Sequence, residues 1–138
     1  MTKEELLQLF GRRAPQPKRA KPRELEHNLQ CACVHWFRYA HSRYSGMLFA
    51  IPNGGLRNAV TAKKLKEEGV LAGVADLMLA VPNRDCHGLF IEMKTEKGRQ
   101  QDTQRNFQQA VTEQGYRYEI CRNKADFIYV IDTYLNNK

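Results

Sequence analysis

Asp76, Glu92 and Lys94 are the residues of this chain whose types and spacing best suit chemistry. Carboxylate oxygens are the ligands that Mg²⁺ and Mn²⁺ prefer in proteins. A lysine beside such an ion can position a water molecule and offset the negative charge that develops around a phosphorus atom under attack. Two carboxylates and a lysine at one place would therefore suit metal-assisted hydrolysis of a phosphodiester bond.

A β-hairpin is the element that must bring these residues together. Apolar, β-prone runs at residues 73–81 and 88–95 flank a turn-forming segment, a pattern that predicts two antiparallel strands. Folding about the turn places Asp76 beside Glu92, and Glu92 and Lys94 share a face because strand side chains alternate. The alternative is an exposed Glu92–Lys94 pair with Asp76 capping a turn.

Close approach of two carboxylates carries an electrostatic cost. Like charges about 4 Å apart repel by about 4 kcal/mol at the effective dielectric near a protein surface. A divalent cation bound to Asp76 and Glu92 would offset this repulsion. The hairpin therefore predicts Mg²⁺ or Mn²⁺ as a cofactor.

Two helices carry polar residues that could complete the site. Apolar spacing predicts a helix over residues 23–41, and Glu26 lies at the edge of its apolar stripe, within reach of the same end of the sheet. A helix over residues 102–114 places Gln104 on its inner stripe, where it could bind Lys94 or a phosphate. The alternatives are that Glu26 complements the positive amino end of its helix and that Gln104 is satisfied at a helix end.

The order of predicted elements is helix, strand, helix, hairpin, helix, strand, helix. The remaining elements are a strand at residues 47–51, a helix from Arg57 to Glu68, a strand at residues 116–121 and a last helix capped by Asn123. This order predicts an α/β domain with a mixed central sheet flanked by helices.

Composition narrows the class of protein. The chain has 138 residues, the length of one domain, and a formal net charge of +7 with a pI of about 9.4, which favours a polyanion as partner. Residues 1–22 form a basic, proline-interrupted arm, either a phosphate-contacting segment or a solubilising leader, and residues 23–138 form the domain. With no apolar run of membrane-spanning length and no secretion signal, we expect a cytoplasmic protein that does not bind membranes.

Several sequence blocks, in a fixed order, resemble the virus-type replication-repair nuclease family, VRR-NUC, of the PD-(D/E)xK nuclease superfamily. The resemblance covers roughly residues 24–135, and its specificity rests on the ordered set. The blocks are Glu26 with Gln30, Pro52-Asn53-Gly54-Gly55 with Arg57, Glu68-Gly69-Val70, Gly73-Val74-Ala75-Asp76, Gly88 to Lys94, Gly98-Arg99 and Gln104. Ala75 departs from the superfamily pattern, which has proline there. Proline would only fix the backbone before Asp76, so we expect activity to be retained.

The resemblance implies a restriction-endonuclease-like core and a Mg²⁺- or Mn²⁺-dependent DNA endonuclease. Its implied catalytic residues are Asp76, Glu92, Lys94, Glu26 and Gln104, and its implied metal ligands are Asp76, Glu92, the Met93 carbonyl and Glu26. Its implied DNA-binding residues are Asn53, Arg57, Lys97, Arg99 and Arg105. It also implies a homodimer that acts on branched DNA such as Holliday junctions.

Two other functions fit the same residues. A nuclease fold that only binds DNA could serve as an accessory module in replication or repair, although such a module has no reason to keep Asp76, Glu92 and Lys94 together. A flap or nonspecific nuclease differs from a junction nuclease only in substrate preference, which the sequence does not separate.

Overall fold

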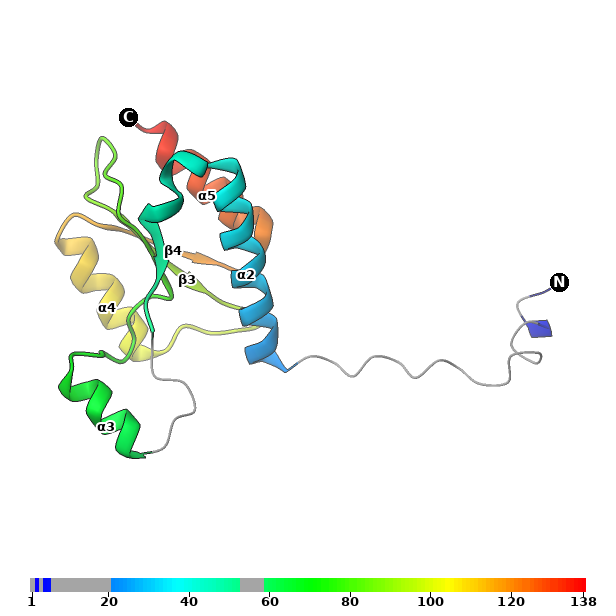
Figure 1. Ribbon diagram of the computed structural model, residues 1–138, viewed down its shortest axis with the longest axis horizontal. Helices are drawn as coiled ribbons and strands as arrows, with labels where there is room; N and C mark the ends of the chain where they lie inside the picture. Colours follow the sequence, from blue (N-terminus) through cyan, green and yellow to red (C-terminus); the bar gives the residue numbers. More distant parts are fainter. Residues whose placement is uncertain (1, 3, 6–20, 53–58) are drawn as a thin grey trace.

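A four-stranded sheet forms the centre of the computed structural model, which describes residues 2, 4–5, 21–52 and 59–138 (Figure 1). The strands lie in the order β1-β2-β3-β4. The first two neighbouring pairs are antiparallel, and β3 and β4 are parallel. The strands are β1 (Leu48–Ala50), β2 (Leu77–Leu79), β3 (Leu89–Met93) and β4 (Arg117–Cys121). The sheet is therefore mixed, as the sequence predicts.

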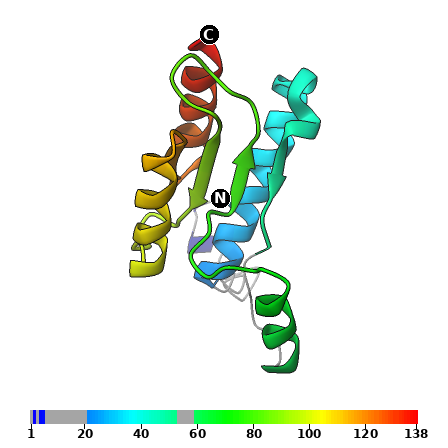
Figure 2. The same cartoon turned by 90° about the vertical axis from the view of Figure 1, so that its left-hand side faces the viewer.

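Helices cover both faces of this sheet. Helices α2 (Pro22–Ala40) and α5 (Lys124–Asn136) pack on one face, and α4 (Asp102–Glu113) packs on the other (Figures 1 and 2). A 3₁₀ helix, η1 (Ser42–Met47), leads from α2 into β1, and α3 (Ala59–Glu67) lies between β1 and β2. None of the helices in the described part of the chain is long and apolar enough to cross a membrane. The arrangement confirms the α/β class.

Strand β3 is the most enclosed element, because it has a strand on each side and helices above and below. All five of its residues are buried. A strand buried on both faces normally reads as a continuous apolar run, and the sequence LFIEM follows that rule except at Glu92. The exception marks the position at which the core accepts a charge.

The sequence predicts the order of the elements more accurately than their ends. Asn123 caps α5 as predicted, because its side chain accepts the Asp126 N–H at 2.7 Å. The predicted strands at residues 47–51 and 73–81 are too long, because only three residues of each form the β1–β2 ladder. One further main-chain bond, from Ile51 N–H to Asp76 O at 2.9 Å, continues the pairing toward the site. The predicted arm at residues 1–22 lies mainly outside the described residues.

Gly73 joins the segment before β2 to the first turn of α4. Its φ of +89° lies in the left-handed region, and a Cβ at this position would lie 2.5 Å from the carbonyl carbon and oxygen of Thr103. Only glycine allows the two backbones to approach so closely. The contact fixes the chain three residues before Asp76 against the helix that carries Gln104.

Replacing Gly73 with alanine should therefore destabilise the fold. We expect Gly73→Ala to lower the free energy of unfolding by roughly 2–5 kcal/mol, since left-handed strain and a backbone clash add. Gly69→Ala is the matched control, because Gly69 has a φ of +104° but no atom within 4 Å of the added Cβ. It should cost only about 1–2 kcal/mol. Urea unfolding measures both values, and equal losses would contradict the contact.

Candidate active site

The three residues singled out by their chemistry meet at one end of the hairpin, the lower end in Figure 1. Asp76 directly precedes β2, Glu92 lies in β3, and Lys94 follows β3. Since Leu77 pairs with Ile91, the next register position places Asp76 opposite Glu92. The Met93 N–H donates to Asp76 Oδ2 at 2.7 Å, which fixes the Asp76 carboxylate against the neighbouring strand.

Glu92 and Lys94 are the buried charged residues within the described part of the chain, with 3% and 8% of their surface exposed. Lys94 Nζ lies 3.9 Å from Glu92 Oε1. The Lys94 N–H donates to the Cys121 carbonyl at 3.0 Å, which extends the β3–β4 pairing to the lysine itself. The site lysine is therefore held by the sheet.

Gln104 binds the buried carboxylate and not Lys94, the protein partner predicted for it. Its Nε2 donates to Glu92 Oε1 at 2.9 Å, while its Oε1 accepts the Gln101 N–H at 2.8 Å. The second bond belongs to a capping box at the start of α4. The helix cap thus orients Gln104, and Gln104 orients Glu92.

Burial and the neighbouring charge of Asp76 favour the protonated form of Glu92. Burial raises the pKa of Glu92 to about 8, and the charge of Asp76 and a hydrogen bond with it contribute to the rise. Burial also raises the pKa of Asp76, against the lowering effect of the hydrogen bond from the Met93 N–H. Two facing acceptors need a proton or a cation between them.

The donor set fits an oxygen-preferring divalent cation. Glu92 Oε2 is buried and has no hydrogen-bond partner among the residues that the structure describes. This orphaned oxygen belongs to the carboxylate that faces Asp76, so a cation bound by both would satisfy it. The described residues contain no cluster of three or more His, Cys, Asp or Glu able to hold a metal. Two carboxylates, main-chain oxygen and water are therefore the available donors, a set typical of Mg²⁺.

Glu26 faces the site from α2. It is half-buried, and its charge contributes to the raised pKa of Glu92, so the two carboxylates interact. It does not join Asp76 and Glu92 in a cluster of three ligands. The structure thus brings Glu26 to the site as a more distant carboxylate.

The turn after Lys94 is held by Arg122, a residue that the sequence analysis does not single out. Arg122 Nη1 donates to the carbonyls of Thr95 and Gly98, at 2.8 and 2.6 Å. A Cβ on Gly98 would lie 3.4 Å from Lys94 Cδ, so the turn also packs on the lysine stem. The only sequence signal is a basic residue directly after the strand that neighbours β3.

Three of the five predicted DNA-binding residues lie in the described part of the chain, and all three are exposed. Lys97 and Arg99 are exposed on the loop between Lys94 and α4, at the site end of the molecule. Arg105 is exposed in the first turn of α4 and forms an ion pair with Asp102, which partly neutralises it. The remaining two, Asn53 and Arg57, lie outside the described residues.

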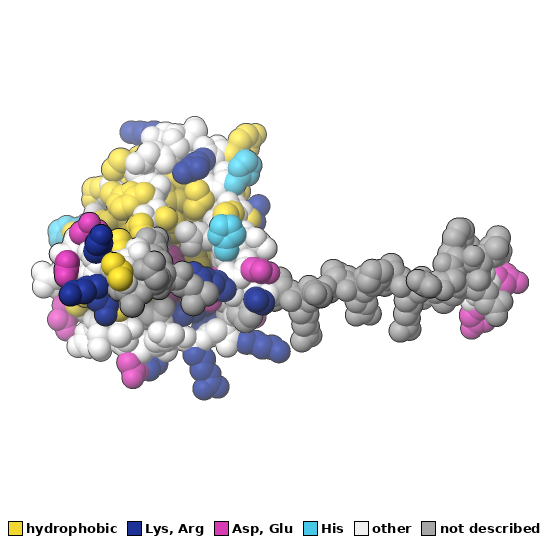
Figure 3. Space-filling model, turned by 60° about the horizontal axis from the view of Figure 1, so that its bottom comes forward, with side chains coloured by type: hydrophobic (Ala, Val, Ile, Leu, Met, Phe, Trp, Pro, Cys, Tyr) yellow, Lys and Arg dark blue, Asp and Glu magenta, His cyan; other side chains and the backbone are white. Residues whose placement is uncertain are grey.

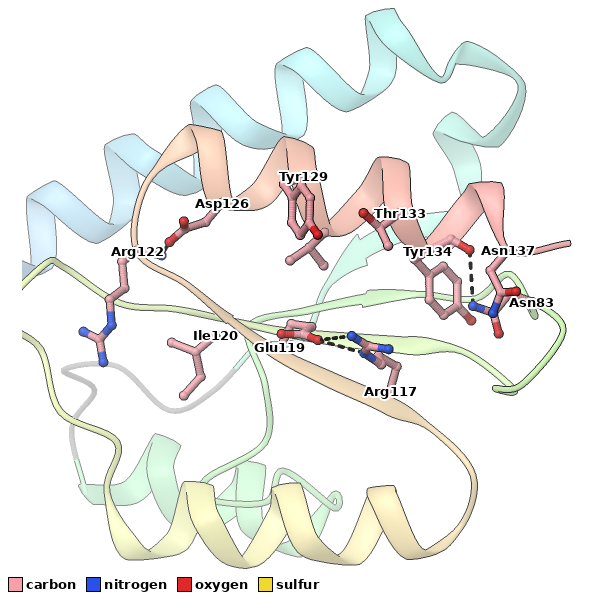
Figure 4. A pocket seen from close by; sticks show the side chains of 11 residues that line it. Asn83, Arg117, Glu119, Ile120, Arg122, Asp126, Tyr129, Thr133, Tyr134 and Asn137 are labelled. Atoms are coloured by element: carbon pink, nitrogen blue, oxygen red, sulfur yellow. Dashed lines mark hydrogen bonds and ion pairs between the residues drawn. The ribbon is translucent and has the colours of Figure 1, made fainter.

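A pocket of about 580 Å³ lies between β4 and α5 (Figure 4), and Arg122, which holds the turn after Lys94, forms part of its lining. Its charged groups have partners within the protein: Arg117 Nη2 lies 2.7 Å from Glu119 Oε1, Asp126 accepts the Arg122 main-chain N–H at 3.0 Å, and the Arg122 side chain donates to the Thr95 and Gly98 carbonyls. Such a lining presents no concentrated charge to a ligand. The buried carboxylates, and not this pocket, are the candidate centre.

Glu92 should make the metal-free protein less stable as the pH rises. Between pH 4.5 and about 8 the folded protein keeps a proton on Glu92 that the unfolded chain has released, so the stabilisation present below pH 4.5 is lost by about pH 8. Glu92→Gln should therefore be more stable than the wild type at pH 8.5 in EDTA. The pKa rise from 4.5 to about 8 sets an upper limit of about 5 kcal/mol on the gain.

Urea unfolding between pH 5 and 9 measures this dependence, with the exposed Glu68→Gln as control. The Glu92→Gln curve should lie above that of the wild type and flatten, whereas the control should follow the wild type. If the free energies of unfolding of wild type and Glu92→Gln change with pH in parallel, Glu92 is not the group whose raised pKa causes the pH dependence.

Comparisons with known proteins identify the family of the chain and agree with its fold. The VRR-NUC domain matches residues 12–125. A solved structure described as "VRR_NUC domain protein" superposes with a TM-score of 0.70 at 22% sequence identity, covering 82% of this chain and 89% of that one. No curated protein matches the chain. Since the family match spans most of the sequence and the fold agrees, the chain belongs to the VRR-NUC family of nuclease-type, DNA-processing domains.

Proposed function

We propose that this protein is a metal-dependent DNA endonuclease that acts on branched DNA such as four-way junctions. The observation that carries the proposal is the buried Glu92 carboxylate, which faces Asp76, lies beside Lys94 and has an orphaned Oε2 within the described structure. A surface that only binds DNA gains nothing from burying such a carboxylate, whereas groups with a strongly shifted pKa are typical of catalytic centres.

Asp76 and Glu92 would hold Mg²⁺ or Mn²⁺, with help from the Met93 carbonyl. The bound ion supplies Lewis-acid stabilisation of the charge that develops on the phosphate oxygens. Gln104 keeps Glu92 Oε1 occupied, which leaves Oε2 for the metal. The protein thus directs one oxygen of Glu92 to its own helix and the other to the cofactor.

Lys94 is placed to act on the attacking water and on the phosphate. Its ammonium group lies at the edge of the carboxylate pair, while main-chain pairing and the packed turn after it restrict its position. A preorganised charge of this kind stabilises a transition state without reorganising when the reaction occurs. Glu26, which interacts with Glu92 from α2, would orient the water.

The positive charge of the chain supports DNA as the substrate. Lys97 and Arg99 lie beside the site and would bind phosphates next to the cleaved bond, and Arg105 would add a contact at the start of α4. Asn53 and Arg57 are proposed as DNA ligands from the family pattern alone. The net charge of +7 supports binding through release of counterions from the phosphates.

A homodimer would suit a junction substrate. Resolution of a four-way junction takes two symmetric cuts, and one small domain carries one such site. A two-fold dimer presents two sites related by the same symmetry as the junction. We therefore propose a dimer as the active form, with the geometry of the two sites setting the preference for branched DNA.

Lys94→Ala should lower the rate of cleavage by about 10²–10⁴-fold, because it removes a charge that acts on the reacting phosphate. Cleavage assays measure this effect. They use end-labelled four-way junction, flap, linear duplex and single strand, each with Mg²⁺, Mn²⁺ or EDTA. Lys138→Ala, at the exposed carboxyl end, is the matched control and should cut at the wild-type rate.

Paired, metal-dependent nicks confined to the junction would support the full proposal. A Lys94→Ala protein that cuts at the wild-type rate would refute the role of Lys94. Tight binding that metal does not alter, without cutting of any substrate, would instead identify a DNA-binding accessory module.

A further inference from the structure

Helix α3 stands apart from the rest of the domain. Both ribbon views show it projecting below the sheet, beyond the end at which Asp76 and Glu92 meet (Figures 1 and 2). Within the described chain it makes no extensive packing contact with another helix or strand. We propose that α3 is an arm that binds the phosphate backbone of a DNA duplex flanking the cleavage site. The inference deepens the proposed nuclease function by naming a further part of its substrate-binding surface.

The outer side of α3 carries its positive charge. Lys63, Lys64 and Lys66 are exposed, whereas Thr61, Ala62 and Leu65 are half-buried on the inner side. Residues three apart share a side of a helix, so Lys63 and Lys66 point outward together and Lys64 lies next to them. Glu67 is the single acidic residue of the helix. Glu68, which directly follows the helix, is also exposed, so the outer side presents three ammonium groups against two carboxylates at its carboxyl end.

Binding of a polyanion should stabilise a short, lysine-rich helix such as α3. Isolated helices shorter than about 12–15 residues are marginal in water, and α3 has nine residues and little tertiary packing. Neighbouring lysines repel one another, and the Lys63–Glu67 spacing has the less favourable order of charges. Phosphates placed against the outer side would remove that repulsion, so binding and helix stability should increase together.

The segment that follows α3 is fixed near the site, although the helix itself projects from the domain. This segment reaches Gly73, whose backbone lies against Thr103 in the first turn of α4. Asp76 follows three residues later. The lysines of α3 and the exposed Lys97 and Arg99 thus belong to the same end of the molecule, where Figure 3 shows many Lys and Arg side chains.

The dimensions of α3 suit a duplex flank. Nine residues at 1.5 Å each span about 14 Å, which corresponds to about four base pairs at 3.4 Å each. Because its lysines present charge without groups shaped to read bases, the contact should be insensitive to sequence. It would position a duplex arm relative to the carboxylates.

Charge removal on α3 tests the proposal. The triple variant Lys63→Gln, Lys64→Gln, Lys66→Gln should bind a labelled four-way junction in EDTA at least 10-fold more weakly at low salt, as measured by fluorescence anisotropy. The slope of log affinity against log salt should fall by about 2–3, since each lost phosphate contact contributes about 0.9. The control variant Arg38→Gln, Arg84→Gln, Lys138→Gln removes the same charge from exposed positions at the other end of the domain.

We expect the control to change affinity less than 3-fold. Equal losses of DNA affinity in both triple variants would show that only net charge matters and would overturn the proposal that α3 binds DNA. An unchanged salt slope in the α3 variant would do the same. A changed oligomeric mass with unchanged DNA affinity would assign α3 to contacts between protein copies.

Hydrogen exchange on the unmutated protein provides a second test. Amides of residues 59–67 should gain protection when junction DNA is added in EDTA, and unchanged exchange there would contradict the proposal. Because both experiments measure binding without metal, they are independent of cleavage. If the protein binds DNA through α3 but never cuts it, only the nuclease proposal is refuted. If the protein cuts DNA but its binding does not depend on α3, only the proposed role of α3 is refuted.

Discussion

The approach of Asp76 to Glu92 at the end of a buried hairpin is the constraint on which the rest of the site depends. A carboxylate that is 3% exposed loses most of its hydration, and a second carboxylate opposite it adds repulsion. The protein offsets this cost with the Met93 N–H on Asp76 and with Gln104 and Lys94 on Glu92. One oxygen, Glu92 Oε2, is left without a partner in the described structure. This remaining deficit is what a divalent cation would correct.

Three neighbouring parts of the domain, α4, β4 and the segment before β2, each fix one part of that arrangement. The capping box of α4 sets the rotamer of Gln104, and the close contact between Gly73 and Thr103 sets the distance between α4 and the chain before Asp76. Strand β4 holds Lys94 through its main chain, and Arg122, directly after the strand, holds the turn that follows Lys94. Since the supports come from α4, β4 and the segment before β2, the site forms only when the whole domain folds.

The sequence predicts the scaffold because its signals are local. Alternation of β-prone runs about a turn located the hairpin and hence the pairing of Asp76 with Glu92, and Asn123 with Asp126 located the start of α5. Contacts between elements distant in sequence were not predictable. The partner of Gln104 depends on how α4 crosses β3, and the role of Arg122 depends on where a turn 24–27 residues earlier in the chain lies. The predicted ends of the first two strands were wrong for a related reason. The length over which they pair depends on their contact with each other, and β1 pairs with β2 over three residues.

The most direct test of this account is to locate Mn²⁺ in crystals by its anomalous scattering. The account predicts a single strong peak between the carboxylates of Asp76 and Glu92, bound to Glu92 Oε2, that disappears in Glu92→Gln crystals grown under the same conditions. A Mn²⁺ peak elsewhere, or no peak at the two carboxylates at pH above 8, would contradict the claim that the buried pair is a metal site.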